Sequence, residues 1–454
     1  MPEKEEIMKI LWLCNIMLPA IAKALGLPYS NREGWLSGIY EKICEENRKT
    51  AEDGRRISGA EGKSRRIELG ICFPVEKMPS GDSVPGNQGR FRIEDTSILC
   101  YAFAENLVAP ENYDGGLEKR MGEILEDFKP DMVHIFGTEF PHTLAMVRAF
   151  GRPERTLVGI QGLCFACAEA YMADLPKRVI ERRTFRDRLK RDGILQQQEK
   201  FRIRGEREKE ALKKVLHITG RTEFDRRETE KINGKAIYHF MNETMRRPFY
   251  SGRWEEEKCV PFRIFLSQGD YPLKGFHYML QAMPEILSHC PEACLYVAGN
   301  SVINCRSLKD KIKLSSYGKY LLELIRNYGL EGHVKAIGRL SAEEMKGQFL
   351  KSSAFVCPSS LENSPNSLGE AMLLGVPAVA ADTGGIPSMM TDGKEGLLYP
   401  PGDVKKLAAC ILRTWEEKDE TVKRTEAART RAWHAHDGNR NYERLLSIYE
   451  EILQ

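Results

Sequence analysis

The stretch that decides the fold spans residues 355–399 and reads FVCPSSLENSPNSLGEAMLLGVPAVAADTGGIPSMMTDGKEGLLY. It opens on a short apolar run, which is followed by a polar loop at 359–367. A helix-like run at 368–374 then stops at Gly375, a residue type that commonly ends helices. Residues 376–381 have the pattern of a short buried strand. Strand, loop, helix and strand in this order predict an α/β unit whose helix begins at the loop.

The N-terminus of such a helix suits a phosphate, because its first backbone N–H groups are unpaired and the helix dipole is positive there. Two carboxylates, Glu362 and Glu370, flank this terminus with the spacing E-x7-E. One carboxylate can face a sugar while the other accepts hydrogen bonds from a ribose diol. Taken alone, the pair is better explained without a ligand, with Glu362 as a solvated loop residue and Glu370 as a surface helix residue.

The two carboxylates come with further elements in a fixed order. Gly375-Val-Pro377 and Thr383-Gly-Gly-Ile-Pro387 follow the block that runs from Glu362 to Met372. Together these elements resemble the family 4 glycosyltransferases of the GT-B fold. The resemblance covers nearly all of the second half of the chain and is weaker over the first. It implies an α/β fold class with two doubly wound, Rossmann-like domains that face a central cleft.

Length and composition agree with two domains. The chain has 454 residues, which exceeds the usual size of one domain. A polar stretch near residue 252 predicts the boundary, with an acceptor-side domain at 1–252 and a nucleotide-sugar-binding domain at 253–435. The resemblance implies that a terminal helix, at about 436–454, packs back on the first domain.

The charge balance and the cysteines indicate which partners and which cellular compartment to expect. A net charge of +3 gives no argument for a nucleic-acid partner. The cysteines are scattered without a disulfide framework, and we find neither a signal peptide nor an apolar run long enough for a membrane span. We therefore expect a cytoplasmic protein. Cys164 and Cys167 form a lone CxxC, and because no second pair lies nearby we do not expect a zinc site.

The resemblance also implies residues that hold the sugar nucleotide. Lys274 lies at a predicted strand-to-helix turn, where a cation suits a diphosphate. The family has an arginine shortly before this lysine, but this chain has Gln268, so Arg339 is a candidate for the second cation. The implied donor-binding residues are Gly34, Gln268, Lys274, Arg339, Asn363, Ser364, Asn366, Ser367, Leu368 and Glu370.

A second group of candidates follows the predicted strand at 132–136. Ligands of open α/β sheets lie beyond the carboxyl ends of the strands. Many family members have a catalytic-region histidine two positions after the one that matches His134, but this chain has Phe136 there. The catalytic candidates are therefore Glu362, Glu139 and His134, with His142 as an alternative to Glu139. A core position is the competing interpretation of His134.

The predicted reaction needs no metal or other cofactor. No Asp-x-Asp pair, which metal-dependent transferases use, occurs in the sequence. The resemblance implies transfer with retention of configuration, in which the leaving phosphate takes the proton from the acceptor. Residues 177–214 are dense in Arg and Lys with acidic residues mixed in. They fit either a salt-bridged, solvated helix pair or a peripheral contact with the inner membrane face.

The sequence thus predicts a retaining glycosyltransferase of bacterial surface polysaccharide synthesis. The donor is a UDP- or GDP-linked sugar, and the acceptor is a glycan or a lipid-diphosphate-linked saccharide. Two alternatives remain, a nucleotide-sugar epimerase of GT-B architecture and a non-catalytic protein that binds sugar nucleotides. Phe136 and Gln268 depart from the family pattern and favour the second alternative.

Overall fold

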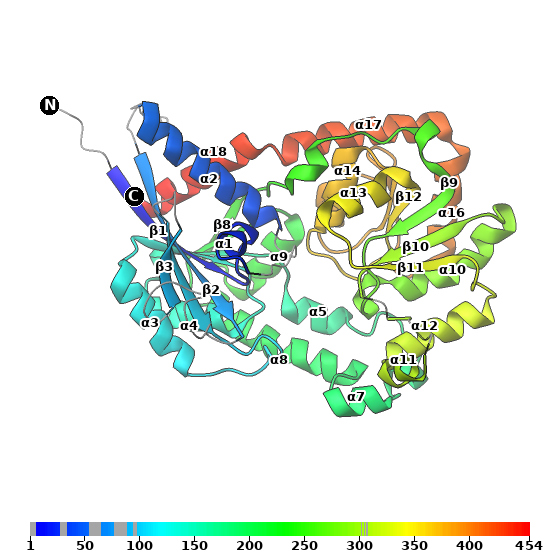
Figure 1. Ribbon diagram of the computed structural model, residues 1–454, viewed down its shortest axis with the longest axis horizontal. Helices are drawn as coiled ribbons and strands as arrows, with labels where there is room; N and C mark the ends of the chain where they lie inside the picture. Colours follow the sequence, from blue (N-terminus) through cyan, green and yellow to red (C-terminus); the bar gives the residue numbers. More distant parts are fainter. Residues whose placement is uncertain are drawn as a thin grey trace.

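The computed structural model describes residues 6–27, 34–53, 65–76, 89–93, 98–300, 302–303, 305 and 307–454. Two α/β domains lie side by side, and helices from the middle of the chain and from its C-terminal part connect them (Figure 1). Each domain has one sheet with helices packed against it, so the predicted α/β class with two doubly wound domains is confirmed. No helix in the described ranges has both the length and the apolar character needed to cross a membrane.

The first sheet has the strand order β3-β4-β2-β1-β5-β6-β7-β8, and only β3 runs antiparallel to its neighbour. Its centre is nearly all apolar and buried, as expected for a parallel sheet with helices on both faces. Its strands are β1 (Glu6–Cys14), β2 (Arg65–Val75), β3 (Arg90–Arg92), β4 (Leu99–Ala104), β5 (Met132–Phe136), β6 (Thr156–Gly159), β7 (His217–Gly220) and β8 (Ile237–Phe240). The helices of this part are α1 (Pro19–Ala24), α2 (Gly34–Asp53), α3 (Gly116–Phe128), α4 (Pro141–Phe150), α8 (Ile194–Leu212) and α9 (Glu223–Ile232).

The second sheet has the order β11-β10-β9-β12-β13-β14, with every neighbouring pair parallel. Its strands are β9 (Val260–Leu266), β10 (Cys294–Ala298), β11 (Val334–Gly338), β12 (Ser352–Cys357), β13 (Ala378–Ala381) and β14 (Leu397–Tyr399). Its helices are α10 (Phe276–His289), α11 (Leu308–Lys313), α12 (Ser316–Asn327), α13 (Ala342–Lys351), α14 (Asn366–Leu374), α15 (Ile386–Met389), α16 (Val404–Glu416) and α17 (Lys418–Ala435). The unit predicted from the deciding stretch is thus β12, a loop, α14 and β13.

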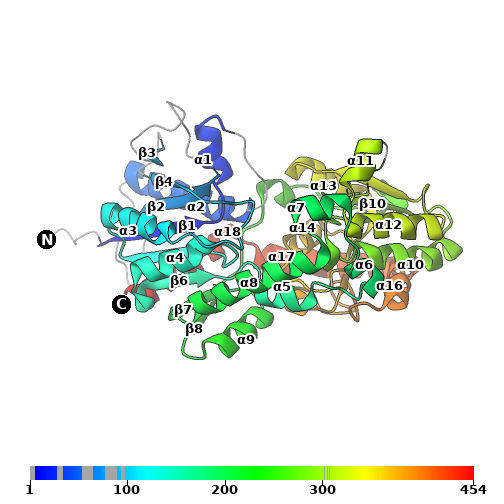
Figure 2. The ribbon, with the colours of Figure 1, turned by 90° about the horizontal axis from the view of Figure 1, so that it is seen from below.

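Between β6 and α8 the chain leaves the first sheet and packs on the second domain. We call residues 171–193 the strap; it follows α5 (Cys164–Ala170) and contains α6 (Lys177–Ile180) and α7 (Phe185–Lys190). Figure 2 shows α5 to α8 running beneath both domains. Tyr171, Leu175 and Val179 are buried in the hydrophobic core of the second domain. The domain predicted at 1–252 therefore contains a segment that packs with the other domain.

The end of the chain crosses in the opposite direction. Helix α17 lies along the second domain, and α18 (Gly438–Leu453) packs against α2 of the first (Figure 1). The hydroxyl of Tyr449 on α18 accepts a hydrogen bond from Trp12 Nε1 at 2.8 Å and is 2.8 Å from His134 Nδ1. These contacts fix α18 on the central strands β1 and β5.

Candidate functional site

The carboxyl ends of both sheets meet at the loop between β12 and α14. Asn363 Nδ2 in this loop donates to the Gln161 carbonyl, which follows β6, at 3.1 Å. Arg221, which follows β7, donates from Nη2 to the Ser364 carbonyl and to Asn366 Oδ1, each at 2.5 Å. The predicted loop residues therefore lie where the two domains face each other.

Lys274 and Glu362 form a closely held pair at this junction. Lys274 Nζ donates to Glu362 Oε1 at 2.7 Å, and Ser359 Oγ donates to the same oxygen at 2.7 Å. Burial lowers the pKa of Lys274, but the Glu362 carboxylate and the Tyr271 phenol outweigh it and raise that pKa above its ordinary value. Lys274 therefore stays charged. The structure brings these two predicted residues together, one as a cation and one as its carboxylate partner.

Glu370 lies on the second turn of α14 and is buried. Arg246 Nε and Nη2 contact Glu370 Oε1 at 2.8 and 2.6 Å. Burial raises the pKa of Glu370 to about 7, while Arg246 acts in the opposite direction. Sequence reasoning missed Arg246, because nothing in the linker sequence distinguishes it from its exposed neighbour Arg247.

The first turn of α14 holds three more of the predicted donor-binding residues, Asn366, Ser367 and Leu368. Ser367 is partly exposed, whereas the Leu368 side chain packs in the core, so that only its backbone can face a ligand. Asn366 is held by Arg221, whose Nη1 lies 3.0 Å from Glu243 Oε2. Arg221 thus places a second positive charge at this helix end, and it comes from the first domain.

Gln268 and Arg339 lie in one polar cluster at the ends of β9, β10 and β11. Arg339 Nε donates to Asn300 Oδ1 at 2.8 Å. Asn300 donates from its backbone N–H and its Nδ2 to Asp270 at 2.7 and 2.8 Å, and Gln268 Nε2 lies 3.5 Å from Asp270 Oδ2. The structure therefore joins the two predicted residues through Asp270 and Asn300, and both side chains are engaged with these partners.

Glu139 ends a chain of hydrogen bonds across the first sheet. Asn15 Nδ2 donates to Glu139 Oε2 at 3.1 Å, and Asn15 Oδ1 lies 3.0 Å from His142 Nε2. His142 Nδ1 lies 2.6 Å from Glu105 Oε2. Gly137 has φ of +96°, and a Cβ there would collide with the Glu139 carboxylate and the Asn15 amide, so the turn requires glycine. Burial raises the pKa of Glu139 above its ordinary value.

His134 does not lie in this site. Its side chain is fully buried on the face of β5 that packs against α18, and its ring is hydrogen-bonded to Tyr449. Burial lowers the pKa of His134 to about 3, so the ring stays neutral. Phe136 points to the same face and packs 3.9 Å from the His134 ring, centroid to centroid. The competing interpretation, a core position, describes His134, and burial removes it from the catalytic candidates.

The remaining sequence candidates are Gly34 and the CxxC pair. Gly34 is the first residue of α2, and the loop before it, 28–33, lies outside the described residues. Cys164 and Cys167 are both free thiols on α5. Within the described part of the chain, no group of three or more His, Cys, Asp or Glu side chains is placed to hold a metal ion.

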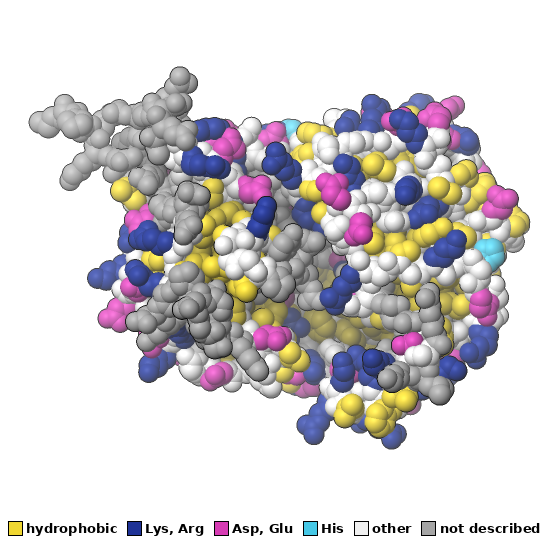
Figure 3. Space-filling view, viewed as in Figure 1, with side chains coloured by type: hydrophobic (Ala, Val, Ile, Leu, Met, Phe, Trp, Pro, Cys, Tyr) yellow, Lys and Arg dark blue, Asp and Glu magenta, His cyan; other side chains and the backbone are white. Residues whose placement is uncertain are grey.

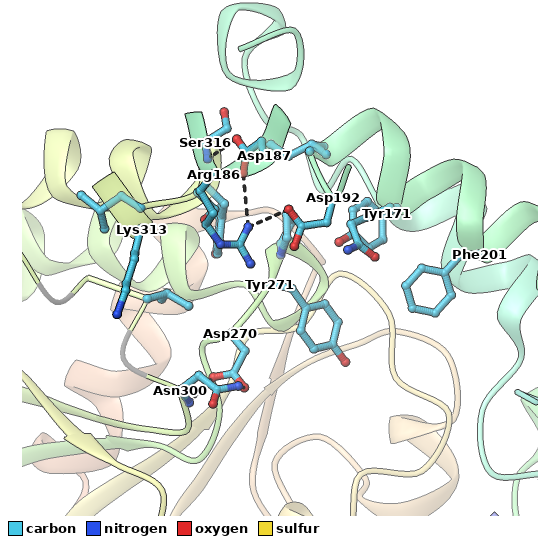
Figure 4. Close-up of a pocket in the computed structure, with 18 of the residues that line it drawn as sticks. Tyr171, Arg186, Asp187, Asp192, Phe201, Asp270, Tyr271, Asn300, Lys313 and Ser316 are labelled. Carbon is cyan, nitrogen blue, oxygen red and sulfur yellow. Dashed lines mark hydrogen bonds and ion pairs between the residues drawn. The ribbon is translucent and has the colours of Figure 1, made fainter. Parts of the chain in front are cut away.

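A cavity of about 580 Å³ lies between the strap, α8 and the second domain. Figure 4 shows the rings of Tyr171, Phe201 and Tyr271 on one side of it and Lys313 on the other. Arg186 also lines the cavity, where Asp187 and Asp192 neutralise it. The mixture of aromatic rings and polar groups, with room for a small ligand, fits a saccharide.

This cavity adjoins the Lys274–Glu362 pair, since Lys274 Nζ lies 5.8 Å from the centre of the Tyr271 ring. Sequence reasoning missed the cavity because its walls come from segments far apart in the chain. The strap brings Tyr171 and Arg186 to the second domain, and no local sequence pattern predicts that packing.

Comparisons with known proteins agree with this geometry. Residues 253–431 match the family model of glycosyl transferases group 1. An amylovoran biosynthesis glycosyltransferase, AmsK of Erwinia amylovora, is 30% identical over 168 residues, which are 34% of this chain and 41% of that protein. A putative colanic acid biosynthesis glycosyltransferase, WcaL of Salmonella typhimurium, is 29% identical over 181 residues, covering 35% and 44% of the two chains. Each match thus spans less than half the length of the curated relative.

Solved structures match over nearly the whole chain. Sucrose-phosphate synthase from Thermosynechococcus elongatus has a TM-score of 0.62 at 13% identity, covering 98% of this chain and 99% of that one. HepE of Anabaena, solved with UDP and glucose, has a TM-score of 0.61 at 15% identity, covering 98% and 100%. At this identity the likeness establishes the fold alone, which is GT-B. Residues 253–431 therefore belong to the glycosyl transferases group 1 family, and the chain carries them on a two-domain GT-B fold.

Proposed function

We propose that the protein is a glycosyltransferase that moves a sugar from a nucleoside-diphosphate sugar to a glycan or a lipid-linked saccharide in surface polysaccharide synthesis. The observation that carries this proposal is the meeting of Lys274, Glu362 and Glu370 around the start of α14, at the junction of the two domains. Support also comes from the relatives, whose names refer to amylovoran and colanic acid biosynthesis.

The chemistry of the site fits departure of a nucleoside diphosphate. Negative charge grows on the leaving phosphate, and Lys274 together with the unpaired N–H groups at the start of α14 can stabilise it without a metal. Glu362, held by Lys274 and Ser359, would position the donor sugar, and Glu370 would accept hydrogen bonds from the ribose. The acceptor hydroxyl would attack the anomeric carbon from the face that the diphosphate leaves, and the leaving phosphate would take the hydroxyl proton as its bond to the sugar breaks. Attack on that face gives retention of configuration.

The acceptor side is proposed to use Glu139 and the cavity beside the strap. Glu139 lies beyond β5, at the edge of the sheet where ligands of parallel sheets bind. The cavity would hold the acceptor saccharide against the rings of Tyr171 and Tyr271, which suit the apolar faces of a sugar. Its lining carries four carboxylates and three cations, so positive charge is not in excess there, which favours an uncharged saccharide over an anion; the charged residues are Arg186, Arg204, Lys313, Asp187, Asp192, Asp270 and Asp310.

A lipid-linked acceptor calls for contact with a membrane, and α7 is the element that suits it. Phe185 is 67% exposed and Leu189 is 74% exposed on this helix, and the neighbouring Arg183, Arg188 and Lys190 are also exposed. Figure 3 shows a hydrophobic patch beside Lys and Arg side chains at the lower edge of the molecule, where Figure 1 places α7. Apolar side chains with a basic rim favour an anionic lipid surface.

A thermal-shift panel of UDP-, GDP- and ADP-linked sugars tests the proposal, because a ligand that binds the folded state alone raises the apparent Tm. We expect one class to raise the Tm and to be consumed slowly in the absence of acceptor. Absence of any shift at millimolar concentration would overturn the proposal. Binding without consumption would favour a non-catalytic protein, and release of an epimerised sugar nucleotide would favour an epimerase.

A further inference from the structure

Arg246 lies in the linker between β8 and β9, residues 241–259, and contacts the carboxylate of Glu370 in the second domain. Both of its contacts, from Nε at 2.8 Å and Nη2 at 2.6 Å, are to the same oxygen, Oε1. The guanidinium also packs 4.8 Å from the centre of the Phe249 ring. Hydrogen bonds and ring contact together fix the guanidinium, so it holds Glu370 in one orientation.

This geometry leaves the second carboxylate oxygen for a ligand. Within the described part of the chain, Arg246 is the side chain that contacts the Glu370 carboxylate, and both contacts are to Oε1. A carboxylate has lone pairs on both oxygens, so Oε2 keeps its capacity to accept hydrogen bonds. Glu370 Oε2 is therefore the atom of this pair that can accept from a diol.

The other charged or titratable side chains packed on α14 are engaged elsewhere on the helix. Arg221 donates to Asn366, Arg429 Nε donates to the Leu373 carbonyl, and the His436 ring lies against Gly369. Arg246 is thus the cation that offsets the buried charge of Glu370.

Arg246 also lines a cavity of about 710 Å³ between α2, the linker and the start of α13. Its lining includes Glu41 and Lys42 of α2 and Ala342 of α13, so that it opens between the two domains. A cavity of this size is in the range of small-molecule sites, and of the Arg246–Glu370 pair it is Arg246 that lines it.

We infer that Arg246 is a positioning residue that holds the Glu370 carboxylate in one orientation and directs its Oε2 at the ribose diol of the nucleotide. This inference rests on the proposed function, and it adds a residue that neither the sequence pattern nor the matched family region contains, since that region begins at residue 253. Glu370 touches the ligand, and Arg246 acts through Glu370.

The role has a definite pH signature. Burial raises the pKa of Glu370 to about 7 although Arg246 lowers it, so removal of Arg246 moves this pKa higher still. A carboxyl whose pKa is raised on folding adds stability below its unfolded pKa, and this contribution is lost as the pH rises through the folded pKa. In the wild type this loss of stability is complete not far above pH 7. In a variant without Arg246 the loss of stability continues to higher pH, because the pKa of Glu370 is higher there.

The first measurement uses the full chain without ligand. The Tm is followed from about pH 5 to pH 9 for the wild type, Arg246→Gln, Glu370→Gln, the double variant, and Arg253→Gln as a control. Arg253 lies on the same linker but forms an exposed pair with Glu426. We expect the Tm of Arg246→Gln to keep falling above pH 7, and the fall to disappear in the double variant. Superimposable profiles for Arg246→Gln and wild type would overturn the inference.

The second measurement titrates UDP-glucose, or whichever of GDP-mannose and ADP-glucose binds better, at pH 7 and pH 9. We expect Arg246→Gln to weaken binding about tenfold at pH 7, which equals about 1.4 kcal/mol, and less at pH 9, where Glu370 ionises again. Arg246→Lys should restore part of the affinity, and Arg253→Gln should match the wild type. Equal weakening at both pH values would show a merely structural role and overturn the inference. If the wild type binds no nucleotide, the proposed function fails, and the ligand-free profiles still decide whether Arg246 controls Glu370.

Discussion

Glu362 and Glu370 belong to one short motif, yet the structure holds their carboxylates in different ways. Glu362 is fixed within the second domain, by Lys274 after β9 and Ser359 after β12. Glu370 is fixed by Arg246, which lies on the linker between the domains. The position of Glu362 thus depends on one rigid sheet, whereas that of Glu370 depends on how the linker lies. We expect the first carboxylate to govern the chemical step and the second to govern nucleotide binding.

The sharpest test of this difference is Glu362→Ala. Loss of the carboxylate leaves the donor sugar without its partner and Lys274 without its counter-ion, and misplaced reactants can lower kcat on the order of 100-fold. The KM for the donor should change much less. Steady-state transfer or donor hydrolysis measures both parameters, and Glu362→Gln separates loss of charge from loss of packing. An unchanged kcat would remove Glu362 from the reaction.

Glu370→Ala should affect the KM for the donor more than kcat, which is the reverse of the effect expected for Glu362→Ala. We expect the KM for the donor to rise about tenfold or more, in line with loss of one well-placed hydrogen-bonding group, and kcat to fall less than in Glu362→Ala. A nucleoside diphosphate without its sugar should lose the same factor in affinity, because the ribose is common to both. If only the intact sugar nucleotide were affected, Glu370 would contact the sugar and not the ribose.

The hydrogen-bond chain to Glu139 offers a smaller effect on the acceptor side. Asn15→Leu removes the hydrogen bond that Asn15 Nδ2 donates to Glu139 Oε2. The pKa of Glu139, which burial already raises, should therefore rise further. Glu139 then ionises only at higher pH, so the acid limb of the kcat/KM profile should move to higher pH. At pH 7 we expect a several-fold loss, on the scale of one hydrogen bond. A profile that keeps its midpoint would show that Glu139 does not titrate in the reaction.

The smallest effect on chemistry should come from α7. Replacing Phe185 and Leu189 by Ser should abolish sedimentation with anionic phosphatidylglycerol vesicles and leave donor hydrolysis unchanged. Val108→Ser is a matched control, because Val108 is 77% exposed but lies far from α7 in the chain. The proposed membrane contact would be contradicted if the wild-type protein did not sediment with anionic vesicles, or if the double variant still did.

The sequence predicted those features of the site that lie within one continuous stretch of the chain, and it missed those that depend on tertiary packing. The loop, α14 and both carboxylates were predicted because strand, helix and motif spacing lie within one continuous stretch. Lys274 was predicted for a similar reason, as its turn directly follows β9. The partners Arg246, Arg221 and Asn15 were missed, because each reaches its carboxylate or helix end only through tertiary packing.

For His134 and Arg339, the position in or after a strand does not determine which groups the side chain contacts. A strand buried on both faces gives no alternation, so the sequence does not say which face His134 occupies, and α18 covers that face. Arg339 is a candidate for a second cation beside Lys274, and in the structure its side chain donates to Asn300. The basic region at 177–214 was described by composition, yet its first part, 177–193, belongs to the strap, and Val179 there is buried in the core of the second domain.

A crystal structure of the full chain with its sugar nucleotide would locate the bound diphosphate and ribose. We expect the diphosphate between Lys274 Nζ and the first turn of α14, with the ribose hydroxyls on Glu370 Oε2. A sugar nucleotide bound elsewhere, or an empty cleft at millimolar ligand, would contradict it.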